Sequence, residues 1–476
     1  MTLPTDMTIS EALAAIASGR LTSEALVAAC LARMNEQQRL NVMITVDEAG
    51  ALAAAREVDA ALQSGTPLKP LSGIPLVIKD NIHARDLPST AGTPALRDFI
   101  PADDAPVVHK LRAAGAIVLG KTNMHELAFG ATGYNTAFHG PELVGVRNPY
   151  DPERIAGGSS SGSAAALGAR MALIALGTDT GGSMRIPCAI NVCASLRPSS
   201  GRYPQQGITP ISSSRDTAGP MALCMADVAL LDGLIMDDLS LPPVQLDQLR
   251  LGVIASFWAN MDDEVKPVAM AARAHLADAG ITLVEVDDTQ LMSINQAIGF
   301  PVVFHEAYDA MVDYLRTQGP GISIDELAEQ IGSPDVRAIY EQFVLPRKLP
   351  TENGGTIDSA PVYEEAMKHG KPALQARYRE LFAQYQLDAL VFPTVPVMAP
   401  KAHPEVSLPE NFHLLIQNTE PGASAGLPGI QLPIGLGART GLPVGMELDG
   451  PEGSDRRLLA IGIVLEALLG RIPAAA

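Results

Sequence analysis

The chain has 476 residues, with 34 Lys and Arg against 53 Asp and Glu, so its formal net charge is −19. This acidic balance argues against binding to nucleic acid or to an anionic membrane surface, because both require a basic face. The hydrophobic fraction of 47% and the charged fraction of 18% are those of a globular protein with a large core.

The N-terminal sequence MTLPTDMTIS lacks the basic start and apolar stretch of a secretory signal. Elsewhere, charges or prolines break the apolar runs well before the roughly 20 residues that a membrane helix needs. Four cysteines are too few for a disulfide framework in a chain of this length, so we interpret Cys188 and Cys193 as buried packing residues. These features predict a cytoplasmic protein.

The first 62 residues have a helical pattern. Thr8 and Glu11 have the spacing of a capping box, and the next apolar residues recur at helical spacing. The latter are Val27, Cys30, Leu31 and Met34. We therefore expect N-terminal helices over residues 1–62.

Short apolar runs then alternate with turns and helical segments, which is typical of an α/β protein. Strands are predicted at Pro75–Ile78 and Ala116–Leu119, with a helix at Pro106–Ala114 between them. Residues 249–287 predict a further strand, helix and strand in βαβ order. Most of the stretch 239–383 carries no recognisable motif, and we expect it to be an insertion or a cap that forms a substrate wall.

Residues 115–122, GAIVLGKT, match the phosphate-loop pattern GxxxxGK[ST] letter for letter. In a true phosphate loop the strand precedes the first Gly, and the following amides are free to bind phosphate. Here the intervening residues are themselves the apolar strand, so their amides would bond within the sheet. We therefore reject nucleotide binding at this motif.

Residues 154–187 contain two Gly-Gly-Ser turns around an Ala-rich helical run and a strand. The first turn leads into a helix N-terminus, where backbone amides can bind a polar ligand. In the second turn, Gly181 and Gly182 allow backbone amides to gather beside Ser183, an arrangement that can stabilise an oxyanion next to a serine nucleophile. This region is the first candidate for an active site.

A serine nucleophile needs a base, and neither Gly-Gly-Ser turn contains a histidine. The remaining candidate is Lys79, at the end of the apolar strand in SGIPLVIKDNI. If it is buried, the ammonium is disfavoured and the neutral amine can act as a base. Asp80 should not pair with Lys79, since neighbouring side chains on a strand point to opposite faces.

Several further motifs accompany these turns, and together the chain resembles the amidase signature family of serine hydrolases. The motifs are GIPLVIKDNI, GKTNMHELAFG, NPYDPERIAGGSSSGSAAA, LGTDTGGSMRIP, DALVFPTVP, AGLPGIQLP and GLPVGMELDG. Within the family, the segments DNIHARDLPSTAGTPALRDF and GLPVGMELDGPEGSDRRLL look most like bacterial indoleacetamide and mandelamide hydrolases.

The resemblance implies an α/β fold in which a large mixed central β-sheet is covered by helices on both faces. It implies one amidase domain over residues 1–476, with a catalytic core at 63–236, the unmatched segment at 239–383, and the rest of the core at 384–476. The implied catalytic residues are Lys79, Ser159 and Ser183, with a cis peptide at Gly158-Ser159. The implied oxyanion hole consists of the amides of Thr180, Gly181, Gly182 and Ser183, and the implied substrate-binding residues are Phe129, Gly133, Tyr134 and Asn135.

We expect an amidase that acts on a small aryl or arylalkyl amide through an acyl-enzyme. Hydrolysis of a carbamate or an anilide remains an alternative, as does the glutaminase subunit of a tRNA-dependent amidotransferase. No cofactor and no metal are expected, because no His/Asp/Glu cluster has ligand spacing. The expected partner is the small-molecule amide, with no nucleic acid and no membrane, and a homodimer is compatible with the sequence.

Overall fold

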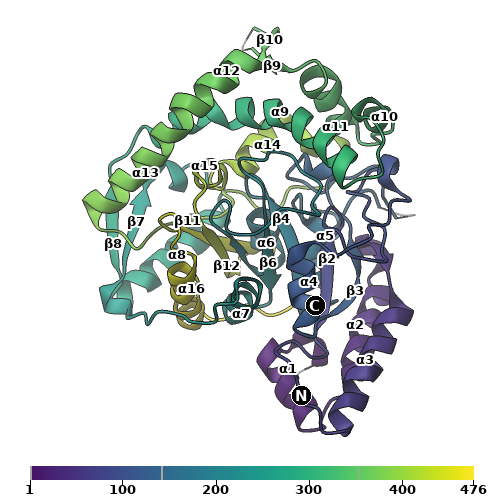
Figure 1. Ribbon diagram of the computed structural model, residues 1–476. Coiled ribbons are helices and arrows are strands. Elements are labelled where there is room, and N and C mark those ends of the chain that lie inside the picture. The colour runs from purple at the N-terminus through teal and green to yellow at the C-terminus, as the bar shows by residue number, and fades with distance from the viewer. Residues whose placement is uncertain (1–2, 141–142, 352, 476) are drawn as a thin grey trace.

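A mixed sheet of 11 strands lies at the centre of the computed structural model, which describes residues 3–140, 143–351 and 353–475 (Figure 1). β2 is parallel to β3 and β4, β7 is parallel to β8 and β11, and the other neighbours are antiparallel. In the order in which they lie side by side, the strands are β1 (Met43–Val46), β3 (Ile117–Thr122), β2 (Pro75–Lys79), β4 (Ile174–Asp179), β6 (Thr217–Ala222), β5 (Ala194–Arg197), β12 (Gly429–Leu436), β13 (Pro443–Asp449), β11 (Ala389–Pro393), β7 (Arg250–Ile254) and β8 (Thr282–Val286).

Helices cover both faces of the sheet, as expected. One row contains α4, α7, α16 and α8, while α5 and α6 pack on the opposite face. The helices are α1 (Ile9–Ala17), α2 (Ser23–Glu36), α3 (Glu48–Gln63), α4 (Pro106–Ala113), α5 (Ser161–Gly168), α6 (Arg185–Asn191), α7 (Met225–Met236), α8 (Val265–Asp278), α9 (Leu291–Thr317), α10 (Ile324–Glu329), α11 (Pro334–Ile339), α12 (Ser359–Glu365), α13 (Lys371–Tyr385), α14 (Pro409–Ile416), α15 (Glu420–Ala425) and α16 (Asp455–Leu469).

Shorter helical turns and a small two-stranded sheet complete the described structure. The two strands are β9 (Lys348–Pro350) and β10 (Thr356–Asp358). The turns are η1 (Pro4–Asp6), η2 (Gln38–Leu40), η3 (Pro94–Leu96), η4 (Glu126–Ala128), η5 (Leu246–Gln248), η6 (Ala255–Trp258), η7 (Tyr340–Val344), η8 (Ala366–Gly370) and η9 (Pro404–Ser407). No helix of the described chain has the length and apolar character to span a membrane.

The predicted N-terminal helices are present, with one addition. The capping box forms at α1, where Thr8 Oγ1 accepts from the Glu11 amide and the Glu11 carboxylate accepts from the Thr8 amide. Between α2 and α3, however, the chain forms β1, which pairs with β3 at the edge of the sheet. The helical pattern of the flanking segments hid this four-residue strand.

The segment 239–383 contributes to the core as well as covering it. β7, α8 and β8 form the predicted βαβ unit and extend the sheet by two strands. After β8, helices α9 to α13 arch along one side of the molecule (Figure 1). The expected cap therefore corresponds to the later part of this segment, while its first part belongs to the sheet.

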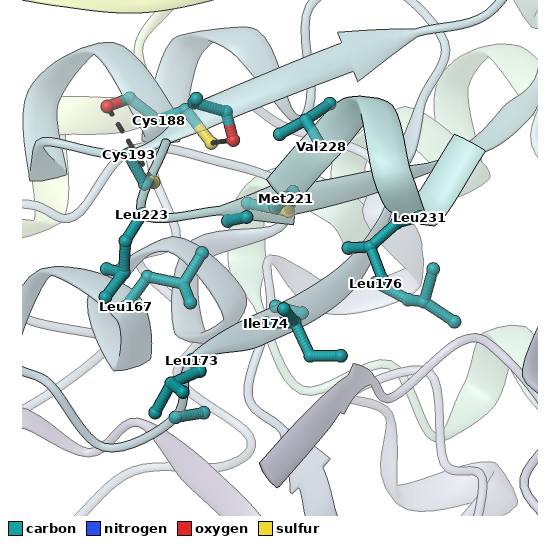
Figure 2. Close-up of a cluster of buried hydrophobic side chains, with 14 of the residues drawn as sticks. Leu167, Leu173, Ile174, Leu176, Cys188, Cys193, Met221, Leu223, Val228 and Leu231 are labelled. Carbon is teal, nitrogen blue, oxygen red and sulfur yellow. Dashed lines mark hydrogen bonds between the residues drawn. The ribbon is translucent and has the colours of Figure 1, made fainter. Parts of the chain in front are cut away.

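A cluster of buried apolar side chains surrounds β4. Figure 2 shows Ile174 and Leu176 of β4 beside Met221 of β6 and Leu231 of α7. Every residue of α5 is buried, and its Ser, Gly and Ala side chains are small, so this helix can lie close to the strands. Cys188 and Cys193 are buried free thiols in the same cluster, as predicted.

Candidate active site

Lys79 is the last residue of β2, and its side chain is completely buried. Its Nζ lies 2.7 Å from Ser159 Oγ and 2.6 Å from Thr178 Oγ1. Burial lowers the pKa of Lys79 to about 7, although the carboxylates of Asp179 and Asp216 raise it. A substantial fraction of this amine is therefore neutral near pH 7 and able to accept a proton.

Asp80 points away from Lys79 and forms a buried ion pair with Lys121, whose Nζ lies 3.2 Å from Asp80 Oδ1. Asp80 Oδ2 also accepts from the Thr90 amide at 3.0 Å. The prediction that Asp80 does not pair with Lys79 is confirmed. Because Lys121 is the lysine of the phosphate-loop pattern, and its neighbours form β3, the structure agrees with the rejection of nucleotide binding at this motif.

Ser159 lies in the loop before α5, and the Gly158-Ser159 peptide bond is cis, as the family resemblance implied. Two backbone hydrogen bonds fix this loop. The His125 amide donates to the Ser159 carbonyl at 3.2 Å, and the Ser160 amide donates to the Ser183 carbonyl at 2.9 Å. The loop that carries Ser159 is thereby held directly against the turn that carries Ser183.

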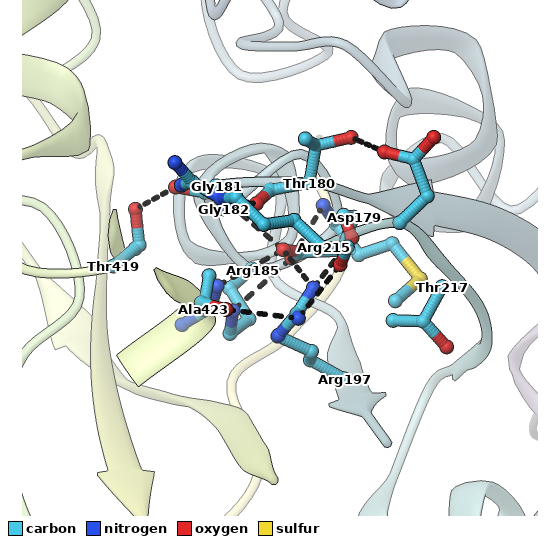
Figure 3. Close-up of polar contacts among 12 residues, drawn as sticks. Asp179, Thr180, Gly181, Gly182, Arg185, Arg197, Arg215, Thr217, Thr419 and Ala423 are labelled. Carbon is cyan, nitrogen blue, oxygen red and sulfur yellow. Dashed lines mark hydrogen bonds and ion pairs between the residues drawn. The ribbon is translucent and has the colours of Figure 1, made fainter. Parts of the chain in front are cut away.

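The turn between β4 and α6 is built around the buried carboxylate of Asp179 (Figure 3). Asp179 accepts from the Gly182 amide at 2.8 Å and from the Met184 amide at 3.2 Å. Burial would raise the pKa of Asp179, but the guanidinium groups of Arg185 and Arg197, 2.9 and 3.2 Å from Oδ1, hold it well below its usual range. Asp179 is therefore a permanently charged anchor for the turn.

The outer side of the turn is also fixed by hydrogen bonds. Thr419 Oγ1 donates to the Gly181 carbonyl at 2.6 Å, and Arg215 Nε donates to the Thr180 carbonyl at 3.2 Å. The Gly182 amide already donates to Asp179, so its hydrogen is not directed at a ligand. Of the four predicted oxyanion-hole amides, those of Thr180, Gly181 and Ser183 therefore remain candidates.

A cavity of about 420 Å³ opens beside Ser183. Its wall is largely apolar and rich in aromatic rings, since five of the ten Phe residues of the chain line it. The rings form a connected cluster in which Phe304 lies 6.4 Å from Phe129 and 5.4 Å from Phe343, measured between centroids. The five are Phe129, Phe300, Phe304, Phe343 and Phe412.

The structure brings only part of the predicted substrate-binding set to this wall. Phe129 lines the cavity, but Gly133, Tyr134 and Asn135 are not among the described residues that do so. The Asn135 side chain is buried, and its amide nitrogen donates to the Gly92 carbonyl at 2.9 Å. Asn135 therefore supports the loop rather than facing a ligand.

Sequence reasoning missed most of the wall, because single residues of distant segments form it. Phe300 and Phe304 lie on α9, four residues apart, and such spacing places two rings on one helix face. Because only 4% of the residues are aromatic, two Phe residues at this spacing could have been noticed in the sequence as a candidate aromatic surface. Arg215, which lines the cavity, and Thr178, which contacts Lys79, had no comparable signal of their own.

Comparisons with known proteins agree with this geometry. The family profile described as Amidase matches residues 25–459. The chain is 45% identical to a mandelamide hydrolase of Pseudomonas putida, over 98% of this chain and 92% of that protein. It is 38% identical to an indoleacetamide hydrolase of Agrobacterium vitis, over 93% and 92% of the two chains. The X-ray structure of a peptide amidase from Stenotrophomonas maltophilia superposes with a TM-score of 0.80 at 28% identity and covers 98% of each chain.

Proposed function

The chain belongs to the amidase family, and from this premise we propose that it hydrolyses small arylalkyl amides through Lys79, Ser159 and Ser183. Its activity is that of a hydrolase acting on carbon–nitrogen bonds other than peptide bonds. The observation that supports the substrate class is the aromatic cavity beside Ser183. An aryl ring loses its contact with water there and gains offset or edge contacts with the Phe rings.

The proposed reaction begins with proton transfer. Neutral Lys79 accepts the proton of Ser159, and Ser159 takes the proton of Ser183 as Ser183 Oγ attacks the amide carbonyl carbon. The three candidate oxyanion-hole amides stabilise the resulting oxyanion, and the rigid turn around Asp179 keeps these donors in place without reorganisation.

The proton then returns through Ser159 to the leaving nitrogen, the C–N bond breaks, and ammonia departs from an acyl-enzyme. Water repeats the sequence on the acyl group: Lys79 and Ser159 remove its proton, and the acid is released with Ser183 restored. Lys79 Nζ lies 2.7 Å from Ser159 Oγ and 2.6 Å from Thr178 Oγ1. The first of these contacts supports the proposed proton transfer from Ser159 to the neutral amine.

The cavity weighs against the glutaminase alternative. Glutamine is zwitterionic, whereas the cavity is lined mostly by apolar side chains, and its Arg215 and Glu420 are already paired with each other. The two relatives named above act, by their names, on amides of arylalkyl acids, which supports the same substrate class. The alternative substrates are anilides of the same acyl group and aryl carbamates.

A turnover screen tests the proposal. One arylacetyl group is presented as primary amide, anilide and ester, beside a related aryl carbamate and an aliphatic amide of similar length. The primary aryl amide should be hydrolysed fastest, and a fluorophosphonate probe should label the wild type. Ser183→Ala should lose several orders of magnitude in turnover together with the label, whereas Ser293→Ala, on the exposed side of α9, should keep both. Equal labelling of Ser183→Ala, or faster hydrolysis of the aliphatic amide or the carbamate, would contradict the proposal.

A further inference from the structure

The wall of the cavity carries two carboxylates that the proposed mechanism does not use, Asp335 and Glu420. Asp335, Ile339 and Phe343 line the cavity at intervals of four residues along α11 and η7. Two members of this row are apolar, and the third is an acid whose side chain is 26% exposed. A partly exposed acid in an apolar wall faces the space that a substrate would fill.

Asp335 is held rigidly in this position. The Glu126 carboxylate, which is fully buried, accepts from the Gly332 amide at 2.9 Å and from the Ser333 amide at 2.6 Å, directly before α11. The Thr136 amide donates to Ser333 Oγ at 3.2 Å. These contacts join the start of α11 to the loop after β3, so Asp335 has a fixed location relative to the active site.

The basic group nearest to Asp335 is the ring of His125. His125 Nε2 lies 3.1 Å from Asp335 Oδ2. On the other side of the ring, Nδ1 accepts from the Gly133 amide at 3.2 Å, so the hydrogen-bond network assigns the proton to Nε2.

The other charges at the wall offset one another. Arg215 and Glu420 also line the cavity, and Arg215 Nη2 lies 3.4 Å from Glu420 Oε1. Asn295 donates to the second oxygen of Glu420 at 2.9 Å. Among the described residues of the wall, Asp335 is then the carboxylate that has no lysine or arginine partner.

We propose that Asp335 determines specificity at this site: it selects aryl amides whose ring carries a hydrogen-bond donor or a cation, and it rejects those that carry a carboxylate. This inference rests on the proposed function and refines its substrate class. A donor on the ring can bond the Asp335 oxygen, whereas an anion would meet a like charge in a water-poor cavity. The same repulsion favours departure of the carboxylate product.

The test uses phenylacetamide and its meta- and para-substituted derivatives with aminomethyl, hydroxymethyl or carboxyl groups. The variants are Asp335→Asn, which keeps an acceptor for His125, and Asp335→Glu, which restores the charge. Asp325→Asn, on the exposed side of α10, is the matched control. The wild type should prefer the aminomethyl and hydroxymethyl amides to the carboxyl amide, and Asp335→Asn should narrow the ratio of kcat/KM values by roughly tenfold.

Inhibition by phenylacetate should tighten by a similar factor in Asp335→Asn, and Asp335→Glu should recover most of the discrimination. Unchanged ratios and unchanged inhibition in a folded Asp335→Asn enzyme would overturn the inference. If the wild type hydrolyses none of the aryl amides, the proposed function fails instead, and the two failures are distinct.

Discussion

At the residue scale, the protonation state of Lys79 depends on whether the carboxylates nearest to it are paired with other cations. Asp179 raises the pKa of Lys79, but its carboxylate is paired with two arginines, so part of its field is cancelled. Asp80 is paired with Lys121. Burial therefore dominates, and the amine has a pKa of about 7 rather than that of an ordinary lysine.

This balance predicts the pH dependence of the wild type and of Thr178→Val. Wild-type kcat/KM should rise with pH through about 7, as Lys79 becomes neutral. Thr178 Oγ1 lies 2.6 Å from Lys79 Nζ and stabilises the ammonium form. Thr178→Val should therefore lower the pKa of Lys79 further and move the rising limb of the profile of kcat/KM against pH to lower pH. The plateau rate should fall roughly tenfold, because the amine loses a contact that orients it.

The measurement is kcat/KM for a primary aryl amide between pH 5 and pH 9, with folding checked by circular dichroism. Thr178→Ser keeps the hydroxyl and should leave the limb close to that of the wild type. A Thr178→Val profile that coincides with the wild type would show that this hydroxyl does not influence the base.

At the element scale, the strands and turns that carry the three candidate catalytic residues could be predicted because their signals are local. Lys79 ends an apolar strand, and Ser183 follows two glycines that adjoin a strand and a helix. The identity of the base still needed the family resemblance, since an isolated lysine at a strand end is ordinarily solvated. The structure adds a contact that is compatible with this role, 2.7 Å from Lys79 Nζ to Ser159 Oγ.

The cavity wall could not be predicted in the same way, because it depends on long-range packing. Asp335 lies in a short helix whose position is set by Glu126, more than 200 residues earlier. The sequence around Asn135 suggested ligand contact, yet its side chain is used within its own loop. β1 was missed because four residues between two helical segments carry too little pattern.

The two hydrogen bonds that Glu126 accepts from the residues before α11 predict the effect of Glu126→Gln. A glutamine presents one acceptor instead of two, so one of the Gly332 and Ser333 amides loses its partner in a buried place. We expect a loss of about 1–3 kcal/mol in the free energy of unfolding. KM for aryl amides should rise more than kcat falls, because the row from Asp335 to Phe343 forms the wall.

Denaturant unfolding and steady-state kinetics measure the two effects. Glu329→Gln, on the exposed side of α10, is the control and should match the wild type in both. Unaltered stability and KM in Glu126→Gln would mean that this carboxylate does not secure the wall.

At the scale of the whole molecule, segments far apart in the sequence are joined through the central sheet and its helices. The N-terminal helix α1 is linked to α7 by the Ile9 amide, which donates to Asp227 Oδ2 at 3.0 Å across 218 positions. At the other end of the chain, Glu466 of α16 accepts from the Met225 amide at 3.1 Å, at the start of α7. A buried carboxylate, Asp227, and a partly buried one, Glu466, therefore connect segments near both chain ends to one helix.

The pKa of Asp227 makes this connection sensitive to pH. Burial raises the pKa of Asp227 from 3.8 to about 6, with the Ile9 amide opposing the shift. A carboxyl whose pKa is higher in the folded state binds protons more tightly when folded, so its contribution to stability is present below about pH 4 and is lost as the pH rises through about 6. Glu466 shifts in the same direction, since burial raises its pKa to about 7.

Asp227→Asn removes this titration but keeps an oxygen that accepts from the Ile9 amide. Relative to the wild type, the variant should therefore become more stable as the pH increases from 4 to 8, and the difference in the free energy of unfolding should grow by up to roughly 3 kcal/mol for a pKa shift of this size. Denaturant unfolding at pH 4, 6 and 8 measures the difference, and Asp278→Asn, at the exposed end of α8, should show none. A difference between Asp227→Asn and the wild type that stays constant with pH would mean that Asp227 titrates alike in the folded and unfolded chains. The carboxylate at the junction of α1 and α7 would then be an ordinary hydrogen-bond acceptor without influence on the pH dependence of stability.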